Sequence, residues 1–111
     1  MEQLVPIFRA TDALSAAEWY GRLGFELDGV HQFEPGFPRY AFLRRGAVWI
    51  HLSEHTGDAE PGGLAYFWVD DVDSIAAEFG VTPEDQPWGR EIELRDPDGN
   101  RLRIAERNDH S

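Results

Sequence analysis

The chain has 111 residues, 41% of them hydrophobic and 28% charged, which indicates a folded globular protein of one domain. Its net charge of −11 at pH 7 disfavours nucleic-acid binding, which needs clustered Lys and Arg, and would either attract cations or simply keep the protein soluble. It has no cysteine, which excludes disulfides, thiol catalysis and Cys-based metal sites.

The first half of the chain predicts a strand, a helix and three more strands. An apolar run at 4–8 predicts the first strand, and Thr11 or Asp12 is suited to the N-cap of the helix. Apolar residues spaced i, i+3, i+4, i+7 then predict a helix that ends at Gly24. Strands are expected at 25–30, 40–44 and 47–53, with a loop at 31–38.

The second half repeats this order after a polar linker at 54–63, where Glu54, Asp58 and Glu60 are interpreted as solvated charge. A strand is expected at 64–69, followed by a helix that Asp70 or Asp71 begins and Gly80 ends. The hairpin segments also correspond: YAFLRRGAVWIHLSE matches EIELRDPDGNRLRIAE. The repeat predicts two βαβββ modules, at about 1–56 and about 64–107, in a single domain spanning 1–111, with a polar tail at 108–111 that holds His110.

The stretch from Gln86 to Gly89 is predicted to be a loop, and the alternation of charged and apolar residues at 90–95 then predicts the first strand of the second hairpin. Trp88 stands there between Pro87 and Gly89, so a large ring sits on a backbone that its neighbours bend. The first module has no ring at the matching point. Trp88 is therefore the first candidate for a ligand-stacking residue.

Strand alternation predicts which side chains face a cleft rather than a helix. In the strand at 47–53, Val48, Ile50 and Leu52 form an apolar set suited to a helix, so the alternate set would face the cleft. The aromatic rings on this face would either line the cleft or fill a core or a dimer interface. His51 would either bind a ligand or be hydrogen-bonded within the sheet. The predicted cleft residues are Val5, Ile7, Trp49, His51, Ser53, Leu64, Tyr66, Trp68, Trp88, Arg101 and Arg103.

Three segments, VPIFRATDALSAAEWYGRLGF, LAYFWVDDVDSI and RDPDGNRLRI, together resemble the vicinal oxygen chelate superfamily, the glyoxalase/bleomycin-resistance/dioxygenase group. QPWGRE followed by RDPDGN is most similar to its bleomycin-resistance proteins. The resemblance implies an α+β fold in which two βαβββ modules form a curved mixed sheet around a cleft. It also implies a homodimer, often with arms exchanged between subunits.

For function, the resemblance implies a non-catalytic protein that confers bleomycin-type antibiotic resistance by sequestering the drug in clefts of a homodimer. Its ligand would be a small cationic aromatic compound, whose flat part stacks on Trp88 with Phe33 or Phe37 opposite. Arg101 and Arg103 would either pair with Glu91 or Glu93 or hold an anionic ligand. The predicted ligand contacts are Trp88, Phe33, Phe37, Trp49, His51, Ser53, Tyr66, Trp68 and Gly89.

Metal-dependent members of the superfamily carry His and Glu ligands at positions that the resemblance places on Val5, Leu64 and Arg103. Val and Leu offer no lone pair and Arg would repel the metal, so we expect no metal, no cofactor and no catalytic residue. The alternatives are a metal-dependent glyoxalase-like lyase or dioxygenase with unusual ligands, or a module that binds another small molecule. No signal peptide or membrane-spanning stretch is visible, so we expect a cytoplasmic protein with no nucleic-acid or membrane partner.

Overall fold

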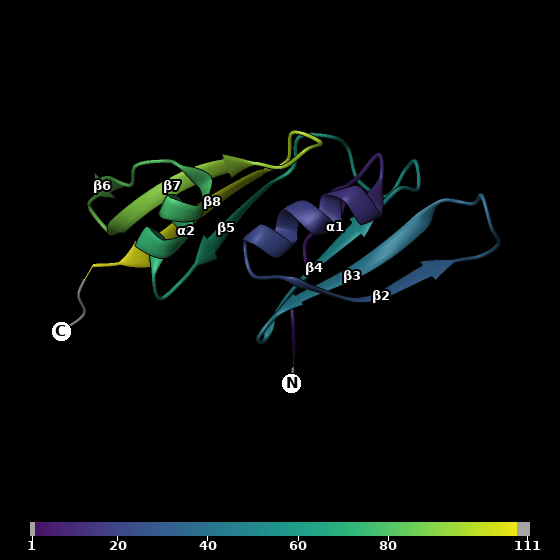
Figure 1. Cartoon of the computed structure of the whole chain (residues 1–111), viewed down its shortest axis with the longest axis horizontal. Coiled ribbons are helices and arrows are strands. Elements are labelled where there is room, and N and C mark those ends of the chain that lie inside the picture. Colours follow the sequence, from purple (N-terminus) through teal and green to yellow (C-terminus); the bar gives the residue numbers. More distant parts are fainter. Residues whose placement is uncertain (1, 109–111) are drawn as a thin grey trace. The chain divides into compact units, whose positions relative to one another are not determined.

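The computed structural model describes residues 2–108, and most of the predicted polar tail, His110 included, lies outside them. The chain divides into two compact units (Figure 1). Unit one holds residues 1–63 together with 96–100, and unit two holds residues 64–95 together with 101–111. None of the described helices is long and apolar enough to cross a membrane.

Unit one contains a four-stranded mixed sheet in the order β1-β4-β3-β2, with β1 parallel to β4 and the other pairs antiparallel. Helix α1 packs against β2, β3 and β4 (Figure 1). The elements are β1 (Ile7–Arg9), α1 (Ala13–Arg22), β2 (Glu26–Gln32), β3 (Arg39–Arg45) and β4 (Val48–Ser53).

Unit two repeats this topology, with the order β5-β8-β7-β6 and β5 parallel to β8. Helix α2 packs against β7 and β8. The α+β fold of paired βαβββ modules is therefore confirmed. The elements are β5 (Leu64–Trp68), α2 (Val72–Phe79), β6 (Glu84–Gln86), β7 (Gly89–Arg95) and β8 (Arg101–Arg107).

Both helices begin at a predicted capping residue, and α2 ends at the predicted Gly80, whereas the C-cap of α1 is Leu23, one residue before the predicted Gly24. Asp12 accepts hydrogen bonds from the backbone N–H groups of Leu14 and Ser15, and Asp71 accepts one from Ser74. Gly80 ends α2 in the left-handed conformation that glycine adopts without strain. The boundaries therefore follow from local chemistry that the sequence displays.

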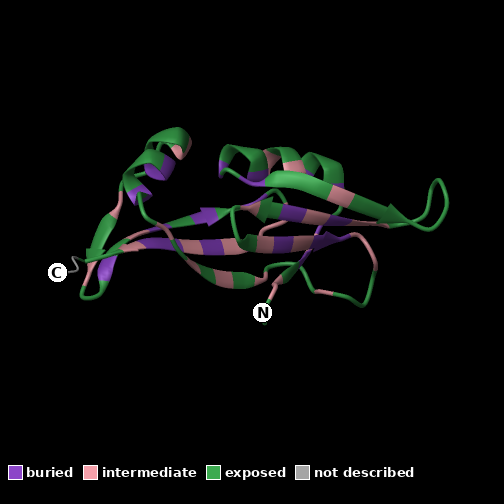
Figure 2. Ribbon diagram, turned by 90° about the horizontal axis from the view of Figure 1, so that it is seen from below, coloured by how far each residue is buried: buried purple, intermediate pink, exposed green. Residues whose placement is uncertain are grey.

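The core of each unit lies between its helix and one face of its sheet. Figure 2 shows buried and more exposed residues alternating along the strands, as a period of two requires. The other face of each sheet carries no helix of its own unit, and we call it the open face. The large apolar strand residues that are buried include Phe8, Leu43, Ile50 and Leu52 in unit one and Ile92, Leu94, Leu102 and Ile104 in unit two.

Several predicted boundaries are wrong. The first strand begins at Ile7 rather than at residue 4, and β2 runs on to Gln32, which shortens the loop predicted at 31–38. The loop predicted around Trp88 is only a two-residue turn, because residues 84–86 form β6, which pairs with β7. The sequence EDQ at 84–86 has no apolar alternation to announce a strand, since the side chains of this short edge strand stay largely in solvent.

The turn at 96–100 belongs to unit one, although β7 and β8 on either side of it belong to unit two. Asp-Pro-Asp-Gly-Asn is a sequence typical of a tight turn, and Gly99 takes the positive φ of 81° that such a turn accepts at glycine. Its side chains do more than form the turn. The Tyr20 hydroxyl in α1 donates to Asp96 Oδ2 at 2.7 Å. Asn100 is fully buried, donates to the Arg9 carbonyl at 2.9 Å and accepts from the Gly63 N–H at 2.9 Å.

Candidate functional site

Three aromatic rings share the open face of unit two, and we call Tyr66, Trp68 and Trp88 the aromatic face. Tyr66 and Trp68 alternate along β5 with less exposed residues, as the parity argument predicts. Their ring centroids are 5.1 Å apart. The three side chains are 42%, 38% and 50% exposed. These rings therefore present flat apolar surface outward instead of filling the core of their unit.

Trp88 occupies the two-residue turn between β6 and β7, where its ring is held by a chain of hydrogen bonds. The indole N–H donates to the Tyr66 hydroxyl at 2.7 Å, and this hydroxyl donates to Glu91 Oε1 at 2.5 Å. Burial, followed by the bond to Glu91, raises the pKa of Tyr66 above its usual value. The hydroxyl therefore stays protonated near neutral pH and fixes the orientation of the indole ring.

The charges of this face are partly paired. Arg101 and Arg103 lie on β8 within 3.8 and 3.2 Å of Glu93, so one of the two predicted alternatives, pairing with a neighbouring glutamate, is the arrangement found. Glu91 instead accepts the Tyr66 hydroxyl and has no Lys or Arg within ion-pair distance among residues 2–108. Its carboxylate is therefore available to attract a cation to the rings.

Gly89, predicted as a ligand contact, is buried where β7 passes close to β8. A Cβ atom at this position would lie far inside van der Waals contact with the carbonyl oxygen of Glu106. The close approach of the two backbones explains the glycine without a ligand. Its role is to let the backbones of β7 and β8 come this close.

The open face of unit one carries a second aromatic group, formed by Tyr40, Phe42 and His51. The Tyr40 hydroxyl lies 2.9 Å from His51 Nδ1, and the ring centroids are 4.9 to 5.3 Å apart. Burial lowers the pKa of His51, so its imidazole is neutral near pH 7. The sequence reasoning missed Tyr40 and Phe42, although they alternate with Ala41 and Leu43 as face residues should.

The remaining predicted contacts of unit one differ in exposure. Trp49 is half-buried, with the Arg44 guanidinium 5.8 Å from its ring. Phe33 and Phe37 are 74% and 48% exposed, with centroids 5.6 Å apart in the turn after β2. Ser53 is fully buried, and its hydroxyl donates to Asp58 at 2.6 Å, so it anchors the linker instead of facing a ligand.

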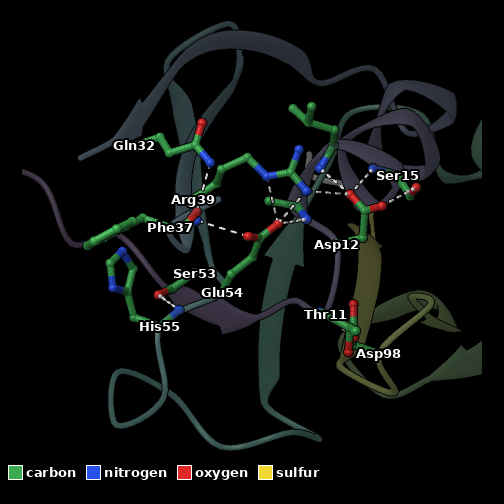
Figure 3. A network of polar contacts seen from close by, with 12 residues as sticks. Thr11, Asp12, Ser15, Gln32, Phe37, Arg39, Ser53, Glu54, His55 and Asp98 are labelled. Carbon is green, nitrogen blue, oxygen red and sulfur yellow. Dashed lines mark hydrogen bonds and ion pairs between the residues drawn. The ribbon is translucent and has the colours of Figure 1, made fainter. Parts of the chain in front are cut away.

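Glu54 is not solvated linker charge, which corrects the prediction (Figure 3). Its carboxylate accepts the backbone N–H of Ala13 at 2.7 Å at the start of α1 and pairs with the Arg39 guanidinium at 2.9 Å. Burial would raise the pKa of Glu54, but the bonds from Ala13 and Arg39 outweigh it and lower the pKa. Glu106 repeats the contact in unit two by accepting the N–H of Val72 at 3.0 Å.

One group of acidic side chains in residues 2–108 is close enough to share a metal ion, namely Asp71, Asp73 and Glu106. Its carboxylates already have partners at the start of α2. Asp71 accepts from Ser74, Glu106 accepts from Val72, and Asp73 pairs with Arg90 at 2.9 Å. The group therefore resembles a helix start more than an open coordination site. Two of the positions at which the superfamily resemblance places metal ligands are Leu64 and Arg103. These two residues are not paired across the strands, because β5 pairs Leu64 with Arg101 and Tyr66 with Arg103.

The comparisons with known proteins agree with this architecture. The bleomycin-binding protein from bleomycin-producing Streptomyces verticillus, complexed with copper(II)-bleomycin, is 27% identical, with a TM-score of 0.71 over 96% of each chain. A bleomycin-binding protein complexed with bleomycin is 25% identical, with a TM-score of 0.70 over 97% of this chain and 100% of that one. A glyoxalase-related enzyme from Clostridium phytofermentans shares the fold, with 20% identity and a TM-score of 0.77 over 96% of this chain and 95% of that one.

No curated protein matches the chain by sequence. The family model described as "Glyoxalase superfamily protein" matches residues 1–111. The match spans both βαβββ modules and the turn that connects β7 to β8. This chain therefore belongs to the glyoxalase superfamily.

Proposed function

We propose that this protein is a non-catalytic, cytoplasmic binding protein that sequesters a flat, cationic aromatic compound of the bleomycin type. The observation that carries the proposal is the aromatic face, in which Trp88 is half exposed and held in place by Tyr66. The similarity to two solved bleomycin-binding proteins supports the same ligand class. Sequestration would confer resistance because bound drug cannot reach its target.

The chemistry of the face suits such a ligand. Stacking on an aromatic ring and a cation–π contact each contribute on the order of 1 kcal/mol. Glu91 adds a carboxylate beside Trp88 and Tyr66, which favours a positively charged ligand over a neutral one of the same shape. The predicted contacts Phe33, Phe37, Trp49 and His51 lie in unit one, and we keep them as proposed ligand contacts of that unit.

Calorimetric titration with bleomycin tests the proposal. Wild-type protein should bind, and Trp88→Ala should weaken the affinity by about tenfold, because a stacking surface is lost. Trp19→Phe is the matched control, since Trp19 lies in α1, which packs against the side of the unit-one sheet that is not the open face. Absence of binding at tens of micromolar would rule out the drug assignment.

We also propose that the protein is a homodimer, on the basis of the family resemblance and the exposed edges of its sheets. The drug would then bind in clefts of the dimer, and the two subunits would either exchange arms or pair without exchange. Light scattering at micromolar concentration should give twice the mass of the 12.6 kDa chain. A monomer under these conditions would contradict the dimer and leave the ligand class untouched.

A metal-dependent lyase or dioxygenase is the second candidate, and one observation favours it. His51 is a neutral imidazole on an open face, which is the form that binds metal ions. Elemental analysis of protein purified without chelator decides the matter. Stoichiometric Ni, Zn, Mn or Fe that His51→Ala abolishes would support the enzyme, and a thermal-shift screen of metabolites would detect a different small-molecule ligand.

A further inference from the structure

Arg107, at the end of β8, lies against one ring of the aromatic face. Its guanidinium carbon is 4.0 Å from the centroid of the Trp68 ring. A planar cation at this distance from an indole makes a cation–π contact, which is strongest with Trp. A cavity of about 260 Å³ adjoins the pair and is lined by Trp68, Val69, Asp70, Glu106 and Arg107.

Little else holds Arg107 in this position. Arg101 and Arg103 on the same strand are paired with Glu93, whereas Arg107 has no carboxylate within ion-pair distance among residues 2–108. Its cross-strand neighbour is Gly89, which has no side chain to pack against it. Arg107 is exposed, so its guanidinium can leave the ring at the cost of that one contact.

We propose that the Trp68 ring recognises a planar organic cation of the amidinium or guanidinium class, and that Arg107 is the chain's own occupant of this position. The ligand cation takes the place of the guanidinium, and the negative charge of Asp70 and Glu106, two of the residues that line the cavity, favours a cation there. This inference rests on the proposed function, because it assigns Trp68 to the ligand-binding face.

Arg107 then lowers the apparent affinity for cations. A ring that is free for only a fraction of the time binds its ligand more weakly by that fraction. A neutral aromatic compound of the same shape gains less from the ring and from the acidic cavity. Arg107 is thus a specificity-determining residue. Only a ligand cation that binds the Trp68 ring strongly enough displaces the Arg107 guanidinium.

The test uses the full chain labelled with ¹⁵N, in which the indole signal of Trp68 is assigned with Trp68→Phe. Benzamidinium chloride is titrated into the wild type and into Arg107→Gln, with benzamide as the neutral probe. The Trp68 signal should shift with benzamidinium, and Arg107→Gln should bind it about fivefold tighter. Arg95→Gln is the matched control, since it removes an equal charge from an exposed position on β7 and should change the affinity little.

Unchanged or weaker binding of benzamidinium by Arg107→Gln would overturn the inference, as would equal tightening for benzamide. Unshifted indole signals from the other Trp residues show that the variant is folded. If that variant does not fold, Arg107→Lys replaces it and should also bind benzamidinium more tightly, because a lysine lacks the planar group. If Arg107→Gln binds benzamidinium more tightly but the protein does not bind bleomycin, only the proposed drug is contradicted. If the protein binds bleomycin but Arg107→Gln does not change benzamidinium binding, only this inference is contradicted.

Discussion

The Trp88 indole N–H donates to the Tyr66 hydroxyl at 2.7 Å, so a half-exposed ring in a two-residue turn has a fixed orientation. A ring that is already ordered loses less conformational entropy when a ligand stacks on it. The Tyr66 hydroxyl donates its own proton to the Glu91 carboxylate, which orients its oxygen to accept the Trp88 indole N–H. Tyr66 and Glu91 are therefore positioning residues for Trp88.

Tyr66→Phe should weaken bleomycin binding by about threefold to tenfold, because the ring at 66 remains while the hydrogen bond that orders Trp88 is lost. Glu91→Gln keeps an acceptor and should lower the affinity less. Calorimetric affinities, together with the fluorescence anisotropy decay of Trp88, measure both effects. Wild-type affinity and wild-type Trp88 mobility in Tyr66→Phe would show that the bond does not position the ring.

Asp96→Ala should destabilise the protein by about 3 kcal/mol or more, because several buried donors lose their acceptor. Asp96 accepts the Tyr20 hydroxyl, the Asn100 side-chain amide and the backbone N–H groups of Asp98 and Asn100. Asp98→Ala, which removes a single exposed bond to Thr11, should cost about 1 kcal/mol or less. Urea unfolding measures both, and similar losses for the two variants would contradict the role of Asp96.

The lowered pKa of Glu54 makes part of the stability depend on pH. Because its folded pKa lies below the ordinary value of 4.5, this contribution is present above that value and is lost as the pH falls through the folded pKa. Glu54→Gln should therefore be less stable than wild type at about pH 7, with a difference that shrinks toward about pH 3. Urea midpoints across this range test it, with the exposed Glu60→Gln as the control. A pH-independent difference would refute the linkage.

Two glycines should respond in opposite directions to alanine. Gly89→Ala places a Cβ against the Glu106 carbonyl oxygen and should cost about 2 kcal/mol or more, because the two backbones must separate. Gly21→Ala, in α1 with open space around the new Cβ, should stabilise by about 0.5–1 kcal/mol. Thermal unfolding of the two variants measures both signs. A neutral Gly89→Ala would show that the β7–β8 contact is looser than described.

Features with a local physical cause were predictable from the sequence. The alternation along β5 places Tyr66 and Trp68 on the open face, and Asp12, Asp71 and Gly80 define helix ends through bonds to near neighbours. The hairpin repeat predicted two modules because each copy carries the same periodicity. These signals act over a few residues, so the sequence displays them without the fold.

Only the tertiary structure decided the roles that depend on distant partners. Tyr20 and Asp96 are 76 residues apart in the chain, and Glu54 reaches the start of α1 41 residues earlier. The strand at 84–86 forms because β7 offers an edge, which its polar sequence does not announce. Whether an exposed carboxyl, hydroxyl or guanidinium is solvated, bonded or stacked is determined by what the fold places beside it, and no local pattern records that.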